Sequence, residues 1–208
     1  MLTVLPEPKH VCAEMLEKCR VSLHEPSIKA FLRRIYSQFL KIKFRMPFLG
    51  EGFRWGVRWR IRRGILAVGN FVYIGPDVHI IYPTVIGDLC LIAAGVQFVG
   101  NDHGYSNIEK PIRIELPDVS PKSIITVIEP DVWIGQSAII IHGVKIGRGS
   151  IVATGSVVTK DIPPYSIVSG IPARIIKLRF SAKQQEVYER IVYGPFSVRQ
   201  CRCVNWSC

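Results

Sequence analysis

The residues best suited to chemistry are three consecutive polar side chains, Asn101, Asp102 and His103, at the start of a stretch without regular pattern. An imidazole has an unperturbed pKa of about 6.5, so near neutrality it is mostly unprotonated and can accept a proton from a reacting group. Asp102 could orient the imidazole, or it could simply form a turn, as aspartate in loops often does. His103 is therefore the first candidate for a catalytic residue, and its position depends on the elements around it.

A column of large apolar residues with a period of six lies on both sides of this stretch. Neither an α-helix, with a period of 3.6, nor a single strand, with a period of 2, places a large residue at every sixth position, whereas a coil of six-residue repeats does. The members of the column are Val68, Ile74, Ile80, Ile86, Ile92, Phe98, Ile128, Ile134, Ile140, Ile146, Val152 and Val158. The pattern predicts a solenoid whose interior these residues fill, with three hexads per triangular turn and about four to five turns in all.

The column is interrupted between Phe98 and Ile128, which are thirty residues, or five hexads, apart. Three of the four in-phase positions between them are not large apolar residues: Gly104, Lys110 and Lys122. We therefore expect a loop from about 101 to 126 that is expelled from the coil. A rigid repeat scaffold tolerates long insertions, and functional residues concentrate in loops that such a scaffold positions. A histidine at the point where the loop leaves is consistent with a site there.

The chain of 208 residues is expected to form one repeat domain with terminal elements. Residues 1–67 are predicted to be an N-terminal capping segment, with helices at 11–20 and 27–46 and a basic, aromatic strand within 48–67 that could be an irregular first turn. Residues 68–180 are predicted to form the solenoid with its expelled loop. Residues 181–208 are expected to form a short helix at 181–192 and a tail.

Positive charge is concentrated before the coil. The net charge is +11, and ten lysines and arginines lie between residues 33 and 63, interleaved with aromatic residues. Such a mixture suits peripheral association with an anionic membrane surface. It also suits an amphipathic helix that caps the open first turn and points its lysines and arginines to water. The stretch belongs to no nucleic-acid-binding module, so we expect no nucleic acid partner.

The remaining composition indicates a cytoplasmic protein. No apolar stretch approaches the roughly 20 residues that a membrane-spanning helix requires. Pro6, Glu7 and Pro8 interrupt the region where a secretory signal would need an apolar run. The cysteines show no paired metal-finger spacing, and three near the end of the chain receive no assigned role: Cys201, Cys203 and Cys208.

Four motifs follow one another in the second half of the coil. They are Asp131-Val132-Trp133-Ile134-Gly135, Gly143-Val144-Lys145-Ile146-Gly147, Gly155-Ser156-Val157-Val158-Thr159-Lys160-Asp161-Ile162-Pro163 and Gly170-Ile171-Pro172-Ala173-Arg174. In this order they resemble the hexapeptide-repeat acyltransferases, especially the maltose and nodulation O-acetyltransferases and the xenobiotic acetyltransferases. The resemblance covers residues 68–180. It implies an all-β fold, a left-handed parallel β-helix, assembled as a homotrimer with acyl-coenzyme A in a cleft between neighbouring coils.

The resemblance also implies roles for individual residues. His103 matches the general base that takes the acceptor's proton as the acceptor oxygen attacks the thioester, with no acyl-enzyme. Asp102 would orient the imidazole or hold the acceptor. Positions that match coenzyme contacts are Trp133, Gln136, Thr154, Thr159, Lys160, Arg174 and Lys177. Lysine and arginine suit the phosphates of the coenzyme, whereas Gln136 replaces the small hydroxyl residue expected there. Acetyl-coenzyme A is then a co-substrate, and neither a metal nor a tightly bound cofactor is implied.

The leading functional hypothesis is acetyl transfer from acetyl-coenzyme A to a hydroxyl of a sugar or surface-glycan precursor, as in polysaccharide biosynthesis. Two alternatives stay open, an acetyltransferase for an antibiotic or other xenobiotic hydroxyl and a non-catalytic β-helix scaffold. A zinc carbonic anhydrase uses the same kind of coil but needs converging histidines, two of them five residues apart. Five residues after His103 stands Ile108, so a metal site is not expected.

Overall fold

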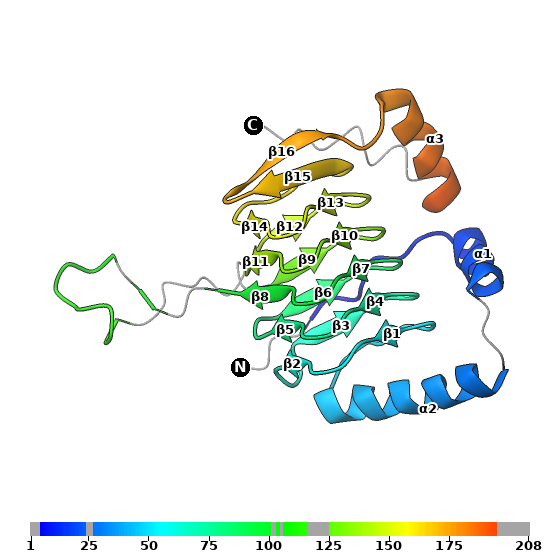
Figure 1. Cartoon of the computed structure of the whole chain (residues 1–208), viewed down its shortest axis with the longest axis horizontal. Helices are drawn as coiled ribbons and strands as arrows, with labels where there is room; N and C mark the ends of the chain where they lie inside the picture. Colours follow the sequence, from blue (N-terminus) through cyan, green and yellow to red (C-terminus); the bar gives the residue numbers. More distant parts are fainter. Residues whose placement is uncertain (1–4, 24–26, 101–102, 105, 116–124, 195–208) are drawn as a thin grey trace.

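The computed structural model describes residues 5–23, 27–100, 103–104, 106–115 and 125–194. Most of this part of the chain is a stack of short strands, and all but the last strand pair in parallel with the strand one coil away (Figure 1). The predicted fold class, a left-handed parallel β-helix with an N-terminal helical segment and a short C-terminal helix, is confirmed.

The strands form three sheets, which are the three faces of the solenoid. The first face consists of β1 (Arg54–Trp55), β4 (Tyr73–Ile74), β7 (Leu91–Ile92), β10 (Trp133–Ile134), β13 (Ile151–Val152), β15 (Ser166–Gly170) and the antiparallel β16 (Ala173–Leu178). The second face consists of β2 (Arg60–Ile61), β5 (His79–Ile80), β8 (Gln97–Val99), β11 (Ile139–Ile141) and β14 (Val157–Val158). The third face consists of β3 (Leu66–Val68), β6 (Thr84–Ile86), β9 (Thr126–Ile128) and β12 (Lys145–Ile146).

The twelve residues of the apolar column fill the interior, as predicted. Each of them is at most 1% exposed. The register explains this burial, because Ile80, Phe98, Ile140 and Val158 are direct partners in successive strands of the second face. A period of six therefore places one column member on each face in turn.

Truncation of Phe98, the largest member of the column and fully buried, is expected to destabilise the stack. Phe98→Ala removes most of a buried ring and leaves a cavity, which should lower the free energy of unfolding by about 3–5 kcal/mol. Urea unfolding followed by circular dichroism measures the change. The control is Val57→Ala, at a side chain that is 64% exposed, where the change should stay within about 0.5 kcal/mol. Equal effects of the two substitutions would contradict the buried column.

The solenoid has about six turns, more than expected, because the pairing begins before residue 68. The stretch 48–67 is not one alternating strand: β1 and β2 are separate short strands that pair with β4 and β5. Phe53 is buried whereas Val57, between the two strands, is exposed at a corner. The irregular first turn is therefore confirmed, while the division at residues 67 and 180 stays a prediction about domains.

Three helices lie outside the strands in the described part of the chain: α1 (Ala13–Ser22), α2 (Ser27–Phe44) and α3 (Ala182–Val192). They agree with the predicted ranges to within two residues at each end. In Figure 1, α2 lies across the end of the stack that carries β1 and β2, and α3 lies at the opposite end. Leu40 of α2 and Met46 just beyond it are buried in the core, so α2 closes the first turn.

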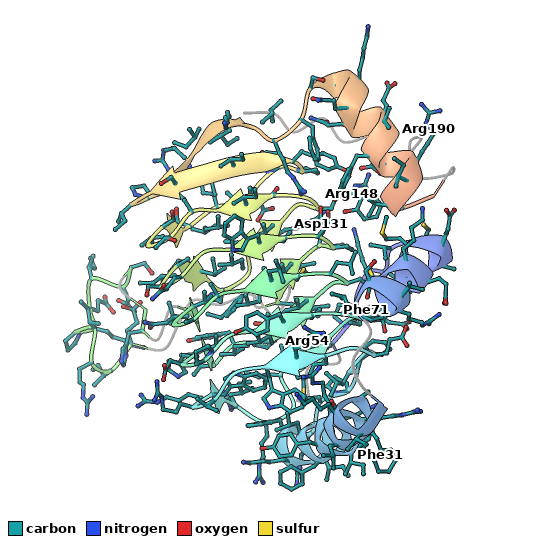
Figure 2. All side chains as sticks on the ribbon, turned by 45° about the vertical axis from the view of Figure 1, so that its right-hand side comes forward. Phe31, Arg54, Phe71, Asp131, Arg148 and Arg190 are labelled. Atoms are coloured by element: carbon teal, nitrogen blue, oxygen red, sulfur yellow. The ribbon has the colours of Figure 1, made fainter. Side chains whose placement is uncertain are left out.

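Buried polar contacts fix α3 to the last turns. Arg148 Nε lies 2.6 Å from Glu189 Oε1, and the Tyr188 hydroxyl donates to Asp131 Oδ2 at 2.8 Å; Figure 2 labels Asp131 and Arg148 beneath the helix. Burial, together with the neighbouring Asp131 carboxylate, raises the pKa of Tyr188 to about 12, so its hydroxyl keeps the proton that it donates.

The N-terminal lead, residues 5–12, ties separate turns together. Asp88 is fully buried and accepts hydrogen bonds from the backbone N–H groups of Val11 and Asn70. Burial alone would raise the pKa of Glu129, but hydrogen bonds from Lys9 Nζ and the Arg148 N–H outweigh it and hold the pKa below its usual value. Helices long and apolar enough to cross a bilayer do not occur among the described residues.

Candidate active site

The expelled loop interrupts the stack between β8 and β9. On the third face Thr84 pairs with Leu66, eighteen residues earlier, but with Thr126, forty-two residues later. The additional twenty-four residues belong to the loop, and its described segment 106–115 lies away from the stack in Figure 1. The predicted bounds of about 101 to 126 are thus close to the observed departure after Val99 and return at Thr126.

The loop leaves from a corner that we call the loop corner, formed by Tyr82, Gly100, His142 and Lys160. Each of these residues stands two positions after a buried partner in the second face, so they occupy equivalent places in successive coils. The rings of Tyr82 and His142 approach to 4.7 Å between centroids. A Cβ at Gly100 would lie 2.1 Å from His142 Nδ1 and 2.8 Å from Tyr82 Cε2. Only glycine leaves room for the chain to depart between the two rings.

His103 lies in the loop three residues beyond Gly100, and its side chain is exposed. Within the described part of the chain, no hydrogen bond or ion pair fixes its ring. Asp102, the predicted orienting residue, lies outside the described residues. His103 is therefore accessible to a substrate, and its role stays a prediction.

Sequence reasoning gave no role to His142, and it did not consider Tyr82. Both belong to the loop corner, and both make contacts beyond the one between their rings. Their positions in the repeat could have identified them. Each lies two residues after a member of the apolar column, at the corner from which the loop leaves. Their placement makes them candidates for holding the base of the loop.

Glu115 is a second residue that the pattern did not indicate. It lies in the loop but is only 8% exposed, and its Oε1 accepts a hydrogen bond from the Asn107 N–H at 3.0 Å. Its Oε2 is buried without a hydrogen-bond partner among the described residues. The described part of the loop therefore has internal structure, with a carboxylate at its centre.

The predicted coenzyme residues fall into two groups on the surface. Trp133 is half exposed on the outer side of the first face, and Gln136 and Thr154 are exposed at the corner that follows it. These two are stacked on adjacent coils, because the Gly155 N–H donates to the Gln136 carbonyl at 2.9 Å. Arg174 and Lys177 lie on β16, at the end of the first face.

Thr159 and Lys160 form the second group, and the structure brings them to the loop corner. Thr159 follows β14 directly, and Lys160 stands one coil beyond His142. Both side chains are exposed. The two groups thus occupy different corners of the solenoid, and the second of them shares its corner with the loop that carries His103.

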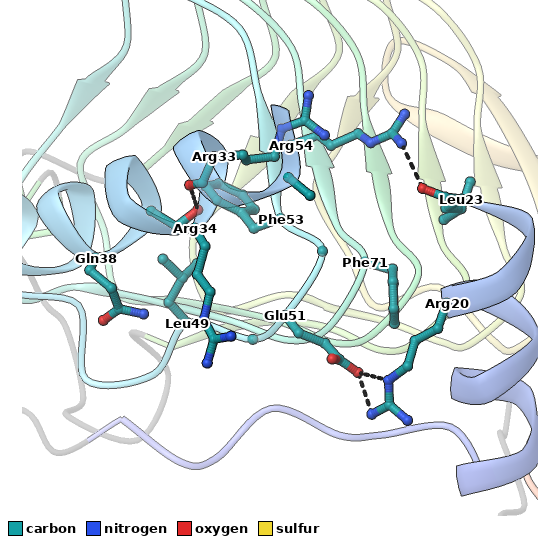
Figure 3. A pocket seen from close by; sticks show the side chains of 14 residues that line it. Arg20, Leu23, Arg33, Arg34, Gln38, Leu49, Glu51, Phe53, Arg54 and Phe71 are labelled. Atoms are coloured by element: carbon teal, nitrogen blue, oxygen red, sulfur yellow. Dashed lines mark hydrogen bonds and ion pairs between the residues drawn. The ribbon is translucent and has the colours of Figure 1, made fainter. Parts of the chain in front are cut away.

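A cavity lies elsewhere on the described part of the chain. It has a volume of about 500 Å³ and lies between α1, α2 and the first turns (Figure 3). Arginines line much of it, with Arg20 paired to Glu51 at 2.6 Å and Arg54 Nη2 donating to the Leu23 carbonyl at 3.3 Å. It is on a different corner from the loop and contains none of the predicted site residues. Within the described ranges, no group of three or more histidine, cysteine, aspartate or glutamate side chains could hold a metal ion.

Comparisons with known proteins agree with this architecture. Residues 125–160 match the family model of the bacterial transferase hexapeptide (six repeats). A chloramphenicol acetyltransferase from Klebsiella aerogenes is 38% identical over 142 residues, which cover 62% of this chain and 68% of the relative. A probable macrolide acetyltransferase from Lysinibacillus sphaericus is 43% identical over 125 residues, covering 54% of this chain and 69% of that protein.

Solved structures show the same fold. A hexapeptide-repeat-containing acetyltransferase from Vibrio cholerae O1 biovar eltor, complexed with acetyl-coenzyme A, is 30% identical with a TM-score of 0.61, and the match covers 71% of this chain and 79% of that one. A maltose O-acetyltransferase from Clostridium difficile 630 is 25% identical with a TM-score of 0.59, covering 81% and 86%. The stack of six-residue repeats and the family match together place the chain among the hexapeptide-repeat transferases. The chain belongs to the hexapeptide-repeat acetyltransferases.

Proposed function

We propose that this protein transfers an acetyl group from acetyl-coenzyme A to a hydroxyl of a sugar or surface-glycan precursor, with His103 as general base. The observation that carries the proposal is the loop corner, where the loop with His103 leaves the stack beside Thr159 and Lys160. The complex of the Vibrio cholerae relative with acetyl-coenzyme A supports the identity of the donor.

His103 acts directly on the acceptor. Its unprotonated nitrogen accepts the hydroxyl proton while the acceptor oxygen forms a bond to the thioester carbonyl carbon. Backbone N–H groups stabilise the oxyanion of the tetrahedral intermediate. When the bond from that carbon to sulfur breaks, the histidine returns the proton to the leaving thiolate. Asp102 orients the imidazole, and no acyl-enzyme forms.

Lys160, Arg174 and Lys177 bind the phosphates of the donor, because these are its strong negative charges. Thr159 assists Lys160, while Trp133, Gln136 and Thr154 line the pantetheine arm. The two groups occupy different parts of the surface of one chain, so we infer that one donor contacts both groups where two protomers meet. This geometry supports the proposed homotrimer.

An outward apolar column on the first face supports trimer contacts. Tyr73, Leu91 and Trp133 are direct partners in successive strands and are between 37% and 50% exposed. A monomer seldom leaves such a stripe in water. The protein is proposed to be cytoplasmic, with peripheral association at the inner face of the membrane, where glycan precursors are assembled.

The second candidate function is acetylation of an antibiotic hydroxyl. It is favoured by one observation, that several relatives sharing 36–43% identity with this chain are named chloramphenicol or macrolide acetyltransferases. The acceptor binds against the same base in both cases, so the two candidates differ in specificity and share the chemistry.

Transfer of radiolabelled acetyl groups onto sugars, nucleotide-linked sugars and drug alcohols tests the proposal. Label is expected on a carbohydrate, and label only on a drug alcohol would favour the second candidate. A thermal shift with acetyl-coenzyme A adds a readout that needs no acceptor, since a ligand of the folded state raises the melting temperature. If acetyl-coenzyme A caused no thermal shift and no acetyl transfer were detected, the non-catalytic scaffold would be the remaining alternative.

A further inference from the structure

Helix α2 carries a continuous apolar surface on its outer side. We call it the outer face of α2; its members are Ile28, Phe31, Leu32, Ile35, Phe39 and Ile42, and each is between 52% and 77% exposed. Their spacing of three, four and seven residues places them along one side of an α-helix. Figure 2 shows α2 below the stack with side chains that extend away from it, Phe31 labelled among them.

The opposite side of α2 is already used. Ser37 and Leu40 are buried and Phe44 packs against the core, so the helix closes the first turn as expected of a capping helix. Lys29, Arg34 and Lys43 are exposed to water, as the capping alternative expects. The outward direction is occupied by apolar side chains, and the basic residues lie along the flanks.

The charges around the outer face have one sign. From Ser27 to Gly50 the sequence contains six lysines and arginines and no aspartate or glutamate. At 100° per residue, Arg34 and Lys41 border one edge of the outer face, and Lys29 and Lys43 border the other. Among the described residues, no ion pair is formed by Lys29, Arg34 or Lys41. An apolar strip between two rows of positive charge matches a surface of anionic headgroups over acyl chains.

Aromatic residues extend this strip onto the first turn. Tyr36 stacks on Trp55 with 5.1 Å between ring centroids, and the two rings line a shallow groove with Leu32 and Phe39. Tyrosine and tryptophan favour the boundary between headgroups and acyl chains, because each has an apolar body and a polar tip. The groove is open and mostly apolar, as is expected for a surface that contacts lipid.

We propose that the outer face of α2 docks on a bilayer containing anionic lipid, with the helix parallel to the membrane surface and the solenoid standing on it. A second copy of the chain is a poorer occupant, because a self-complementary contact would bring two sets of six positive charges together. The docking concerns a surface separate from the loop corner and does not depend on the proposed acceptor.

The docked orientation places the loop corner close to the membrane. The loop departs after β8. Within the second face, β8 is two strands away from β2, a separation of about 10 Å at the usual strand spacing. If the proposed function holds, the acceptor hydroxyl is within reach of sugars attached to a lipid at the bilayer surface.

Flotation of the full chain with vesicles tests the docking. Binding to phosphatidylcholine vesicles that contain phosphatidylglycerol is expected to exceed binding to phosphatidylcholine alone by about tenfold or more, and to weaken with added salt. Ile35→Glu, at a side chain that is 54% exposed, should abolish it. The matched control is Val187→Glu on α3, which is 50% exposed at the opposite end of the stack and should bind as the unmodified protein does.

Three results would overturn the docking: no flotation with the anionic vesicles, equal flotation of both vesicle types, or unchanged flotation of Ile35→Glu. A lower assembly mass for Ile35→Glu by light scattering would assign the outer face to a protein contact and also overturn it. Acetyl transfer to a soluble acceptor should be unchanged in Ile35→Glu, so a failure of docking and a failure of the proposed function are distinguishable.

Discussion

Replacement of His103 by alanine is expected to lower kcat for acetyl transfer by about a thousandfold, within the range that a general base contributes. The alanine variant loses the group that accepts the acceptor's proton, and the exposed position of His103 leaves no packing to disturb. Steady-state kinetics with a soluble acceptor measure the effect. Stabilisation by acetyl-coenzyme A should persist in the variant, because the proposed donor contacts do not include His103.

The control for this prediction is His79→Gln, a histidine on β5 outside the loop. Its effect on kcat should be less than about threefold, since it takes no part in the proton transfer. Turnover of His103→Ala at the rate of the unmodified enzyme would refute the assigned base, whatever the acceptor proves to be.

Substitution of Gly100 by valine is expected to reduce kcat by about a hundredfold, because a shift of about 1 Å in a catalytic group can cost that much. The new Cβ would overlap His142 Nδ1 and Tyr82 Cε2, so the rings or the base of the loop must move. His103 is only three residues further along the chain and would move with it. The solenoid itself should keep its melting temperature to within a few degrees, since the contact is at a corner.

A double variant separates this steric explanation from a general loss of structure. Combining Gly100→Val with His142→Ala removes the closest overlapping ring and should recover at least about tenfold of the lost activity, because the two residues contact each other directly. If His142→Ala added its own loss to that of Gly100→Val, the rings would not be the obstacle, and the loop would be placed by other contacts.

The solenoid could be predicted because its interior imposes a period that no other element has. The twelve-residue column was identified from spacing alone. The loop adds a whole number of hexads, so Phe98 and Ile140 remain direct partners and the six-residue spacing continues after the loop. The first turn could not be predicted in this way. Leu49, Trp55 and Ile61 are six apart, but Ile61 and Val68 are seven apart, so one additional residue hides the continuation of the column.

Much of the candidate site depends on register, which spacing does not show by itself. His103 stood out as a histidine at the break in the pattern. His142 did not, because its proximity to the loop arises from the parallel pairing of β8 with β11. The distribution of the coenzyme residues over two corners likewise follows from the fold, since neighbours in sequence such as Thr154 and Thr159 lie on opposite sides of β14.

The sequence also could not show which side of α2 faces the stack. Apolar residues occur on both sides of this helix, and only the burial of Ser37 and Leu40 shows which side faces the stack. A helix that is amphipathic in composition can thus cover a core with one side and still expose a second apolar surface.

A crystal structure of the assembled protein with coenzyme A tests the central claim most directly. The account predicts that the coenzyme lies along the surface between two protomers. Its thiol sulfur should lie within about 4 Å of the His103 imidazole, close enough for a hydrogen bond and proton transfer between them. A coenzyme bound away from the loop corner would contradict it. So would a His103 ring that faces bulk solvent while the thiol lies at another part of the surface.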